Sequence, residues 1–442
     1  MYGKINSALA LLLASSTFMM QSIVESKLVF AHYMVGTVDP NTNHAQQDID
    51  GAINVGFDAF ALNVGNPGAD WAKNTVQQLF DYAGTRQSFK LFFSFDFYAD
   101  GDISQHQALF AQFKDHPAHL RYGPGDLPVV SSYSGGGIGP DAWRSFKTAN
   151  NVYLIPNPEA DGNYYSNPSG FFQSWGDAVD GVFSWETAWP DTSDTPVNVS
   201  SAKDVAVKSA ADAAGKAYMM GLSSLQYKHC CGDSWYRAGE TNLPERMEQI
   251  LSVSPEFTEV ITWNDAGESH YIGPCWPEGL TSEILQYGNS DTIPHSAWQP
   301  LIASFIDAFK SGSTNAGAMK PHSGTFAGAL WYRGVLTSCS NVGDKPRGAG
   351  AAVDAVNYAV VLPAGSSGLS IRVTSGGQVL ATQAVSGGLN YNSVAGMRAG
   401  AQKVELVDGS GNVVATASGS VDVGTSPTNG FCNYNYYVAG LQ

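Results

Sequence analysis

Eight short apolar runs recur between residues 28 and 264 of this 442-residue chain, and each is continuous rather than alternating. A continuous apolar run is typical of a parallel strand that is buried on both faces. The runs are Leu28–Met34, Phe57–Val64, Phe89–Asp96, Pro128–Tyr133, Val152–Pro156, Val179–Trp185, Ala217–Leu222 and Phe257–Asn264. The pattern therefore predicts eight buried strands.

Several segments between these runs have apolar residues at helical spacing. One amphipathic helix is predicted after Asp70 and another after Asp102, each with the aspartate as its N-cap. A last helix is predicted over Trp298–Phe309. Strands that alternate with helices over roughly 280 residues predict an α/β fold, the (β/α)8 TIM barrel, over residues 27–312. A doubly wound open sheet is the alternative, but no glycine-rich phosphate loop follows the first strand.

The pattern changes after Gly312. Residues 313–326 are rich in Gly, Ser, Ala and Pro and are predicted to form a linker. Beyond them apolar residues alternate with polar ones, as at Leu369, Ile371 and Val373, and turn signals such as Gly376-Gly377 separate the runs. We therefore predict a C-terminal antiparallel β-sandwich accessory domain over residues 327–442.

The composition narrows the class of partner. The net charge of −16 makes a nucleic acid or an anionic membrane surface a poor partner, whereas a neutral polysaccharide is not repelled. Aromatic residues make up 12% of the chain, which suits sugar binding but also an ordinary core. We expect a monomer that needs no cofactor and no metal.

The N-terminus has Lys4, an apolar stretch from Ala8 to Met20 and small polar residues up to Ser26. This order predicts a secretory signal peptide over residues 1–26, with a first buried helix as the alternative. Secretion would expose the sequon at Asn198 to glycosylation.

Five cysteines stand at positions 230, 231, 275, 339 and 432. An oxidising compartment allows two disulfides. We expect Cys339 to pair with Cys432, and Cys275 to pair with Cys230 or Cys231. A zinc site is the alternative, but the chain has no C-x-x-C or H-x-x-x-H spacing.

Most of the apolar runs end in polar or aromatic side chains, where a barrel enzyme builds its active site. The candidate substrate-binding residues at or near these ends are His32, Tyr33, Asn63, Asp96, Tyr133, Trp185, Glu186, Tyr227, Lys228, Trp263, His270 and Tyr271, and Asn157 and Glu159 follow the fifth run. The alternative for the two tryptophans is packing in the core. The alternative for His32 is a hydrogen bond to the backbone, and for Lys228 it is an exposed position on the surface.

Glycosidic hydrolysis needs one carboxylic acid to protonate the leaving oxygen and a second carboxylate to activate water or attack the sugar. Asp265 and Glu268 follow the eighth run, and Gly267 between them permits a tight turn. They are the candidate catalytic pair. Asp265 as a helix cap, with Glu268 exposed to solvent, is the alternative. No nucleophile elbow of the Gly-x-Ser-x-Gly type follows a strand.

These residues resemble the fungal α-1,3-glucanases, or mutanases, of glycoside hydrolase family 71. The most specific motif is Trp-Asn-Asp-x-Gly-Glu-Ser-His-Tyr, which begins at Trp263. The resemblance is carried by Ala31–Gly36, Phe57–Asn63, Phe93–Asp96, Phe183–Pro190, Gly232–Tyr236, Thr262–Pro274, His295–Trp298 and Cys432–Tyr436.

The resemblance implies a secreted endo-hydrolase of fungal cell-wall α-1,3-glucan that inverts the anomeric centre, with Asp265 and Glu268 as its acid/base pair. We expect Asp265 to be the base and Glu268 the acid, with the pKa of Glu268 raised in an apolar pocket. The chain departs from the family pattern at Ala266 and at Ser223–Tyr227, where sugar-facing aromatics are expected. A glucan-binding protein without turnover and a hydrolase of mixed α-1,3/1,4-glucan are the alternative functions.

Overall fold

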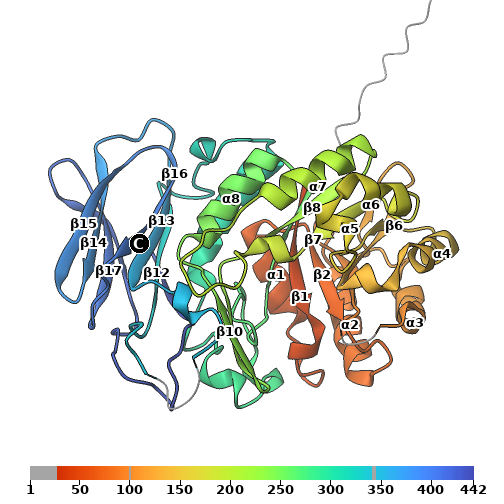
Figure 1. Ribbon diagram of the computed structural model, residues 1–442, viewed down its shortest axis with the longest axis horizontal. Helices are drawn as coiled ribbons and strands as arrows, with labels where there is room; N and C mark the ends of the chain where they lie inside the picture. The colour runs from red at the N-terminus through yellow and green to blue at the C-terminus, as the bar shows by residue number, and fades with distance from the viewer. Residues whose placement is uncertain (1–26, 99–100, 341–344) are drawn as a thin grey trace, which may run out of the picture.

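The computed structural model describes residues 27–98, 101–340 and 345–442. The predicted signal peptide lies outside these residues. A curled parallel sheet forms the larger part of the molecule, and two antiparallel sheets at the C-terminal end form the rest (Figure 1). No helix among the described residues has the length and apolar character needed to cross a membrane.

The parallel sheet has the order β6-β5-β3-β2-β1-β11-β8-β7. All eight predicted runs contribute to it: β1 Leu28–Met34, β2 Ala59–Val64, β3 Lys90–Asp96, β5 Leu127–Tyr133, β6 Tyr153–Ile155, β7 Gly181–Ser184, β8 Ala217–Leu222 and β11 Phe257–Val260. The short strand β4 (Arg121–Tyr122) pairs with β5 in the antiparallel sense.

The two end strands of this sheet, β6 and β7, share no ladder. Two backbone hydrogen bonds link their segments, from Asp180 N to Leu154 O (2.9 Å) and from Phe183 N to Pro156 O (2.9 Å). Strand β6 is only three residues long, because Pro156 follows it and proline has no N–H for a ladder. The structure therefore shows a curled parallel sheet whose two end segments are joined by these two backbone hydrogen bonds.

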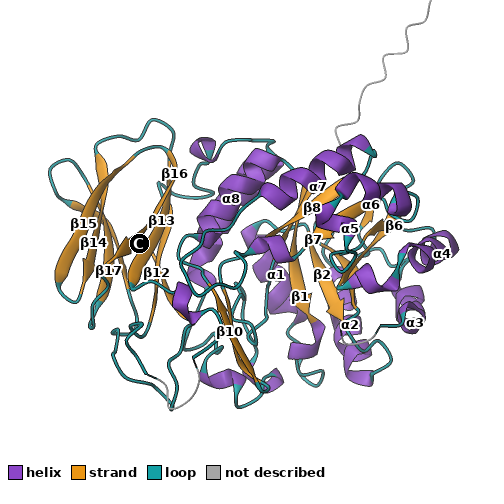
Figure 2. Ribbon diagram, in the orientation of Figure 1, coloured by secondary structure: helices purple, strands orange, loops and turns teal. Residues whose placement is uncertain are grey.

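Nine α-helices are present in the described residues, and most of them cover the outside of the curled sheet (Figure 2). They are α1 Ala45–Val55, α2 Asp70–Ala83, α3 Ile103–Phe113, α4 Pro140–Asn150, α5 Asn163–Ser166, α6 Pro168–Trp175, α7 Ala202–Ala213, α8 Asn242–Val253 and α9 Gln299–Lys310. Asp102 caps α3 as predicted, by accepting from Ser104 N. Asp70 is instead the first residue of α2 and makes no cap hydrogen bond, so that prediction is wrong.

Two apolar cores result from the alternation of side chains along each strand. Phe30, Phe92, Phe183 and Phe257 belong to the core inside the curled sheet. The neighbouring positions, such as Val29 and Ala31, pack outward against the helices. The site residues therefore rest on a filled interior rather than a pore.

The C-terminal part contains two four-stranded antiparallel sheets, with the orders β16-β13-β12-β19 and β15-β14-β17-β18. Their strands are β12 Ala327–Arg333, β13 Ala355–Leu362, β14 Leu369–Ser375, β15 Gln378–Val385, β16 Gly388–Ala395, β17 Gln402–Val407, β18 Val413–Ser418 and β19 Tyr436–Gly440. An apolar cluster joins the sheets, with Leu330 and Val356 from one and Val373 and Leu406 from the other.

Strands β12 and β13 are buried along their whole length, unlike β14, which alternates. One face of β12 and β13 packs on the second antiparallel sheet. Residues of their other face, such as Trp331 and Val361, belong to the same core as Leu301 and Phe305 of α9. The disulfide between Cys339 and Cys432 is present as predicted. Cys230, Cys231 and Cys275 are not disulfide-bonded in the structure, and Cys275 is buried in a separate apolar cluster, so the predicted second disulfide with Cys275 is wrong.

Candidate active site

A cavity of about 410 Å³ opens at the carboxyl ends of the parallel strands. Eight of the residues that the sequence predicts for the site line it: Asn63, Asp96, Tyr133, Trp185, Glu186, Lys228, Asp265 and Glu268. They come from the ends of β2, β3 and β5, from the two residues directly after β7, from strand β9 (Gln226–Cys230) and from the loop after β11. Strand ends far apart in sequence therefore converge on one cavity.

The loop after β11 is tightly folded. The strand ends at Val260, four residues earlier than predicted, and Thr262 N then donates to His270 O (2.9 Å). The side chain of Thr262 accepts from Asp265 N (2.9 Å), and Asp265 Oδ1 accepts from Glu268 N (2.9 Å). These bonds hold both carboxylates at the cavity on a single turn.

The side chain of Ala266 lies behind this loop. It is fully buried and packs with Tyr271 and Cys275, so it does not face the cavity. The sequence interpretation that an absent aromatic at position 266 costs a sugar contact is therefore wrong. Leu225 is also fully buried, whereas the next residue, Gln226, lines the cavity.

Glu268 is held by two neighbours. Gln226 Nε2 donates to Glu268 Oε2 (2.5 Å), and His270 Nε2 lies 3.1 Å from the same oxygen. Burial alone would raise the pKa of Glu268, but the hydrogen bonds and charge of its neighbours outweigh burial and lower it. The structure therefore reverses the expectation that the pKa of Glu268 is raised.

Asp265 behaves in the opposite way. Burial raises its pKa, and the negative charge of Glu268 raises it further, against the partial compensation by His270. An oxygen of Asp265 lies within 4.8 Å of an oxygen of Glu268, so the two groups titrate together. Of the two groups, Asp265 therefore keeps a proton to the higher pH and Glu268 ionises first.

The same two carboxylates and His270 bring their donor atoms within 4.8 Å of one another. If the described part of the chain binds a cation, this group is a candidate ligand set. That the protein needs no metal therefore remains a prediction.

Eight of the predicted site residues do not line the cavity: His32, Tyr33, Asn157, Glu159, Tyr227, Trp263, His270 and Tyr271. The hydroxyl of Tyr33 and the indole N–H of Trp263 both donate to Asp48 of α1, on the helix side of the sheet. Alternation along β1 could have excluded Tyr33, because a strand that turns His32 inward turns Tyr33 outward.

The other buried members support their neighbours. His32 Nδ1 lies 2.6 Å from Glu259 Oε1, and the His32 ring meets that of Trp185 edge to face at 4.8 Å. Tyr271 donates to Ile293 O (2.6 Å) and stacks on His295. Tyr227 is buried beside Tyr287 and Tyr434.

Seven cavity residues were not predicted from the sequence: Met34, Tyr98, Thr192, Gln226, Trp235, Arg237 and Arg347. Three of them belong to an antiparallel hairpin of β9 (Gln226–Cys230) and β10 (Asp233–Arg237). Trp235 is paired with Lys228, and Arg237 with Gln226, so all four side chains share one face. Their period of two is a local signal that could have predicted this face.

Arg347 comes from the C-terminal part of the chain. Its segment runs beside β10, with Arg347 N donating to Ser234 O (3.0 Å) and Tyr236 N donating to Arg347 O (2.8 Å). The Trp235 ring has Lys228 Nζ at 4.7 Å and the Arg347 guanidinium at 5.8 Å. No local sequence signal joins Arg347 to this site.

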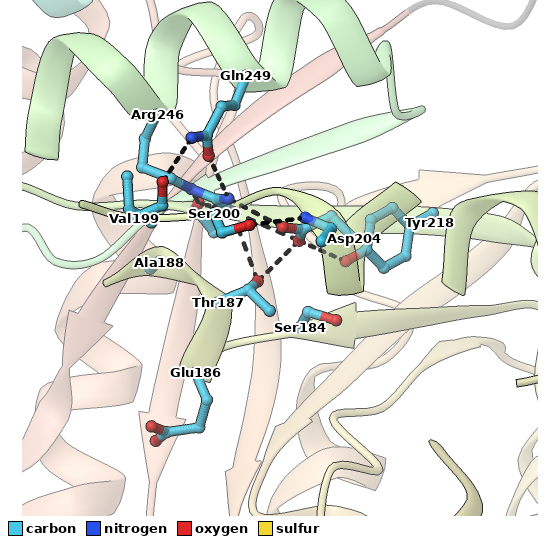
Figure 3. Close-up of polar contacts among 12 residues, drawn as sticks. Ser184, Glu186, Thr187, Ala188, Val199, Ser200, Asp204, Tyr218, Arg246 and Gln249 are labelled. Carbon is cyan, nitrogen blue, oxygen red and sulfur yellow. Dashed lines mark hydrogen bonds and ion pairs between the residues drawn. The ribbon is translucent and has the colours of Figure 1, made fainter. Parts of the chain in front are cut away.

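A buried ion pair lies behind the wall that carries Glu186 (Figure 3). Arg246 Nη1 donates to Asp204 Oδ2 (2.9 Å), and neither side chain is exposed. The hydroxyls of Thr187 and Tyr218 each donate to Asp204 Oδ1 (2.7 Å). Thr187 directly follows Glu186, so this network fixes the segment from which Glu186 reaches the cavity.

Two proteins of named activity are similar to most of this chain. A mutanase of Penicillium rubens is 32% identical over 428 residues, covering 95% of this chain and 89% of its own length. The glucan endo-1,3-alpha-glucosidase agn1 of Schizosaccharomyces pombe is 31% identical over 339 residues, 72% of this chain and 73% of its own.

Among solved structures, the GH99 endo-alpha-mannosidase of Bacteroides thetaiotaomicron matches with a TM-score of 0.50 at 13% identity, covering 64% of this chain and 98% of its own. This likeness concerns the fold alone. The model of glycosyl hydrolase family 71 matches residues 25–442. Its match spans both the parallel sheet with its carboxylate loop and the C-terminal sheets, so the chain belongs to glycosyl hydrolase family 71 and is a glycosidase.

Proposed function

We propose that this protein is a secreted, monomeric endo-hydrolase of cell-wall α-1,3-glucan. The observation that carries the proposal is the Asp265–Glu268 pair at the cavity, in a chain about one-third identical to a mutanase and to a glucan endo-1,3-alpha-glucosidase. A third relative, 24% identical over 447 residues, is an ascus wall endo-1,3-alpha-glucanase of Schizosaccharomyces pombe, which supports an extracellular site of action.

The electrostatics of the pair favour Asp265 as the general acid, because its raised pKa lets it hold a proton to a higher pH than Glu268 does. Glu268, whose pKa is lowered, is the ionised base that takes a proton from water. Water then attacks the anomeric carbon, the glycosidic bond breaks, and the leaving oxygen takes the proton of Asp265. This assignment reverses the roles expected from the sequence.

We further propose that hydrolysis inverts the anomeric centre. Inverting enzymes ordinarily hold their carboxyl groups roughly 6.5–9.5 Å apart. In the structure one oxygen of Asp265 lies within 4.8 Å of one oxygen of Glu268, which is shorter than this range, so inversion requires the two carboxyl groups to move apart when sugar and water bind. NMR of the fresh product tests this, because inversion of an α-linkage releases the β-anomer first and an α-anomer would contradict it.

The sugar chain would lie across the aromatic rings of the cavity. Trp185, Tyr133 and Trp235 line it and can pack on the C–H faces of glucose units. Asn63, Asp96 and the cations of the hairpin can bond to hydroxyls. His32, Tyr33, Tyr227, Trp263, His270 and Tyr271 would then act through the residues that they hold.

We also propose that residues 27–312 form a (β/α)8 barrel, residues 313–326 a connecting segment and residues 327–442 a β-sandwich. The order of the parallel strands and the two hydrogen bonds between the end segments support the barrel. The apolar cluster shared by the two antiparallel sheets supports the sandwich.

Release of reducing sugar from purified insoluble α-1,3-glucan, with sizing of the products, tests the function. We expect oligosaccharides from this polymer and none from β-1,3-glucan. Binding without release of sugar would instead indicate a glucan-binding protein without turnover. Preferred cleavage of mixed α-1,3/1,4-glucan would indicate a hydrolase of that polymer. Either result would contradict the proposal.

A further inference from the structure

Two adjacent cysteines stand at the turn of the hairpin that forms one wall of the cavity. Cys230 ends β9, and the turn Cys231-Gly232 leads into β10. Their sulfurs lie 3.0 Å apart, closer than non-bonded sulfur atoms normally approach, and are not bonded in the structure. Cys230 is buried and Cys231 is exposed.

Neither cysteine has another cysteine to pair with. Cys339 and Cys432 are bonded to each other, and Cys275 is buried in a separate cluster with Ala266 and Tyr271. The Cys339–Cys432 disulfide implies an oxidising environment for the folded chain. Two thiols held in contact in that environment are poised to oxidise.

We propose that Cys230 and Cys231 form a vicinal disulfide, a covalent modification that stiffens the cavity-lining hairpin. The hairpin carries Gln226, Lys228, Trp235 and Arg237 into the cavity, so its stiffness bears directly on the site. Cys231 has a positive φ of 63°, and its backbone N donates to Glu283 Oε2 (3.2 Å), which already orders the turn.

The chemistry needs an oxidant of the disulfide class, such as glutathione disulfide. The exposed Cys231 thiolate attacks one sulfur of glutathione disulfide and releases one glutathione thiolate. The sulfur of Cys230 then loses its proton and attacks Cys231 Sγ, which releases the second glutathione. Two protons and two electrons leave the cysteines, and one glutathione disulfide becomes two thiols. Burial raises the pKa of Cys230 to about 11, which makes Cys231 the first thiol to react.

This disulfide is expected to be easier to reduce than the other one. Adjacent Cα atoms are about 3.8 Å apart across a trans peptide, shorter than the usual span of roughly 4.4–6.8 Å between disulfide-bonded cysteines. Strain and the exposure of Cys231 favour reduction, whereas Cys339 and Cys432 are only 2% and 1% exposed.

A count of free thiols tests the proposal. The protein is secreted by its expression host, kept unreduced, unfolded in guanidinium and then titrated with Ellman's reagent. We expect one thiol per chain, from Cys275. Three thiols would overturn the proposal. Cys275→Ala should lower the count to zero, and Cys230→Ser should raise it to two, from Cys231 and Cys275. The count is made on unfolded chains, so it stays valid for a variant that folds poorly.

Peptide mapping locates the bond and also needs no activity measurement. Trypsin releases residues 229–237, and this peptide should be about 2 Da lighter than its dithiol form. A dithiol peptide or a glutathione adduct on Cys231 would overturn the assignment. Mild reduction should speed tryptic cleavage of the native protein after Lys228 several-fold. Equal cleavage rates before and after reduction would overturn the proposal that the disulfide stiffens the hairpin.

Discussion

At the scale of single residues, Glu268 shows how neighbours set the chemistry of a carboxylate. It is buried beside Asp265, and burial raises the pKa of a carboxyl group, yet Gln226 and His270 lower the pKa of Glu268. The side chain of Asp265 accepts instead from the backbone N–H of Glu268, and its pKa is raised by burial. Two carboxyl groups three positions apart thus have their pKa values shifted in opposite directions.

Asp265→Asn and Glu268→Gln should each lower turnover of α-1,3-glucan by at least about 100-fold, because each removes one proton-transfer group. Reducing-sugar assays measure the loss, and circular dichroism checks that the fold is intact. The exposed Asp70→Asn serves as the matched control. Near-normal activity of either site variant would refute the pairing.

The two variants should differ on α-glucosyl fluoride, whose leaving group needs no acid. Asp265→Asn should hydrolyse the fluoride far better than it hydrolyses glucan. Glu268→Gln should fail on both substrates because the base is lost. The opposite result would restore the roles expected from the sequence.

Activity should depend on pH through the same pair. It should fall below the lowered pKa of Glu268, where the base becomes protonated, and above the raised pKa of Asp265, where the acid is lost. Gln226→Leu removes a donor that favours ionised Glu268, so the acid limb of kcat/KM should move to higher pH. An unmoved limb, the same as in the surface control Gln77→Leu, would contradict this role of Gln226.

At the scale of elements, turns and short segments aim the functional side chains. The loop after β11 carries both carboxylates, the β9–β10 hairpin carries four residues of the wall, and the segment after β7 carries Glu186. The segment after β7 is anchored by the buried network of Asp204, Arg246 and Thr187 (Figure 3).

Arg246→Met should lower the free energy of unfolding by about 3–5 kcal/mol, because it leaves the charge of Asp204 buried without its cation. Urea denaturation measures the change. The exposed pair of Lys73 and Asp70 offers the control, and Lys73→Met should cost no more than about 1 kcal/mol. Equal effects of the two variants would mean that the buried pair contributes little.

At the scale of the whole molecule, the C-terminal part is hydrogen-bonded to the β9–β10 hairpin and to loops of the preceding part of the chain. Trp331 Nε1 donates to Glu240 O (2.9 Å), Asn435 Nδ2 donates to Tyr287 O (2.8 Å), and the hydroxyls of Tyr236 and Tyr436 lie 2.8 Å apart. The same part of the chain sends Arg347 into the cavity. The C-terminal part therefore contributes to the site itself.

Arg347→Ala should raise the KM for α-1,3-glucan about tenfold, with a smaller effect on kcat, because Arg347 lines the cavity but is not one of the two proposed proton-transfer groups. Steady-state kinetics on soluble oligosaccharides measures both constants. Arg398→Ala, in the same C-terminal part and outside the cavity, is the matched control. A KM equal to that of the control would contradict a substrate contact by Arg347.

The amino-acid sequence by itself determined the features that are encoded locally. Continuous apolar runs placed all eight parallel strands, and the polar residues after those runs placed eight of the cavity's side chains, including Asp265 and Glu268. These inferences hold because burial and periodicity act over a few neighbouring residues, and because parallel strands bring their carboxyl ends to one edge.

Only the tertiary structure decided what depends on contacts between distant segments. It turned Tyr33 and Trp263 toward Asp48 and away from the cavity, brought Arg347 beside Trp235, and left Cys275 without a partner. It also set the opposite pKa shifts of Asp265 and Glu268. Burial and electrostatic fields depend on every group packed nearby, whatever its distance along the chain, so no local pattern contains them.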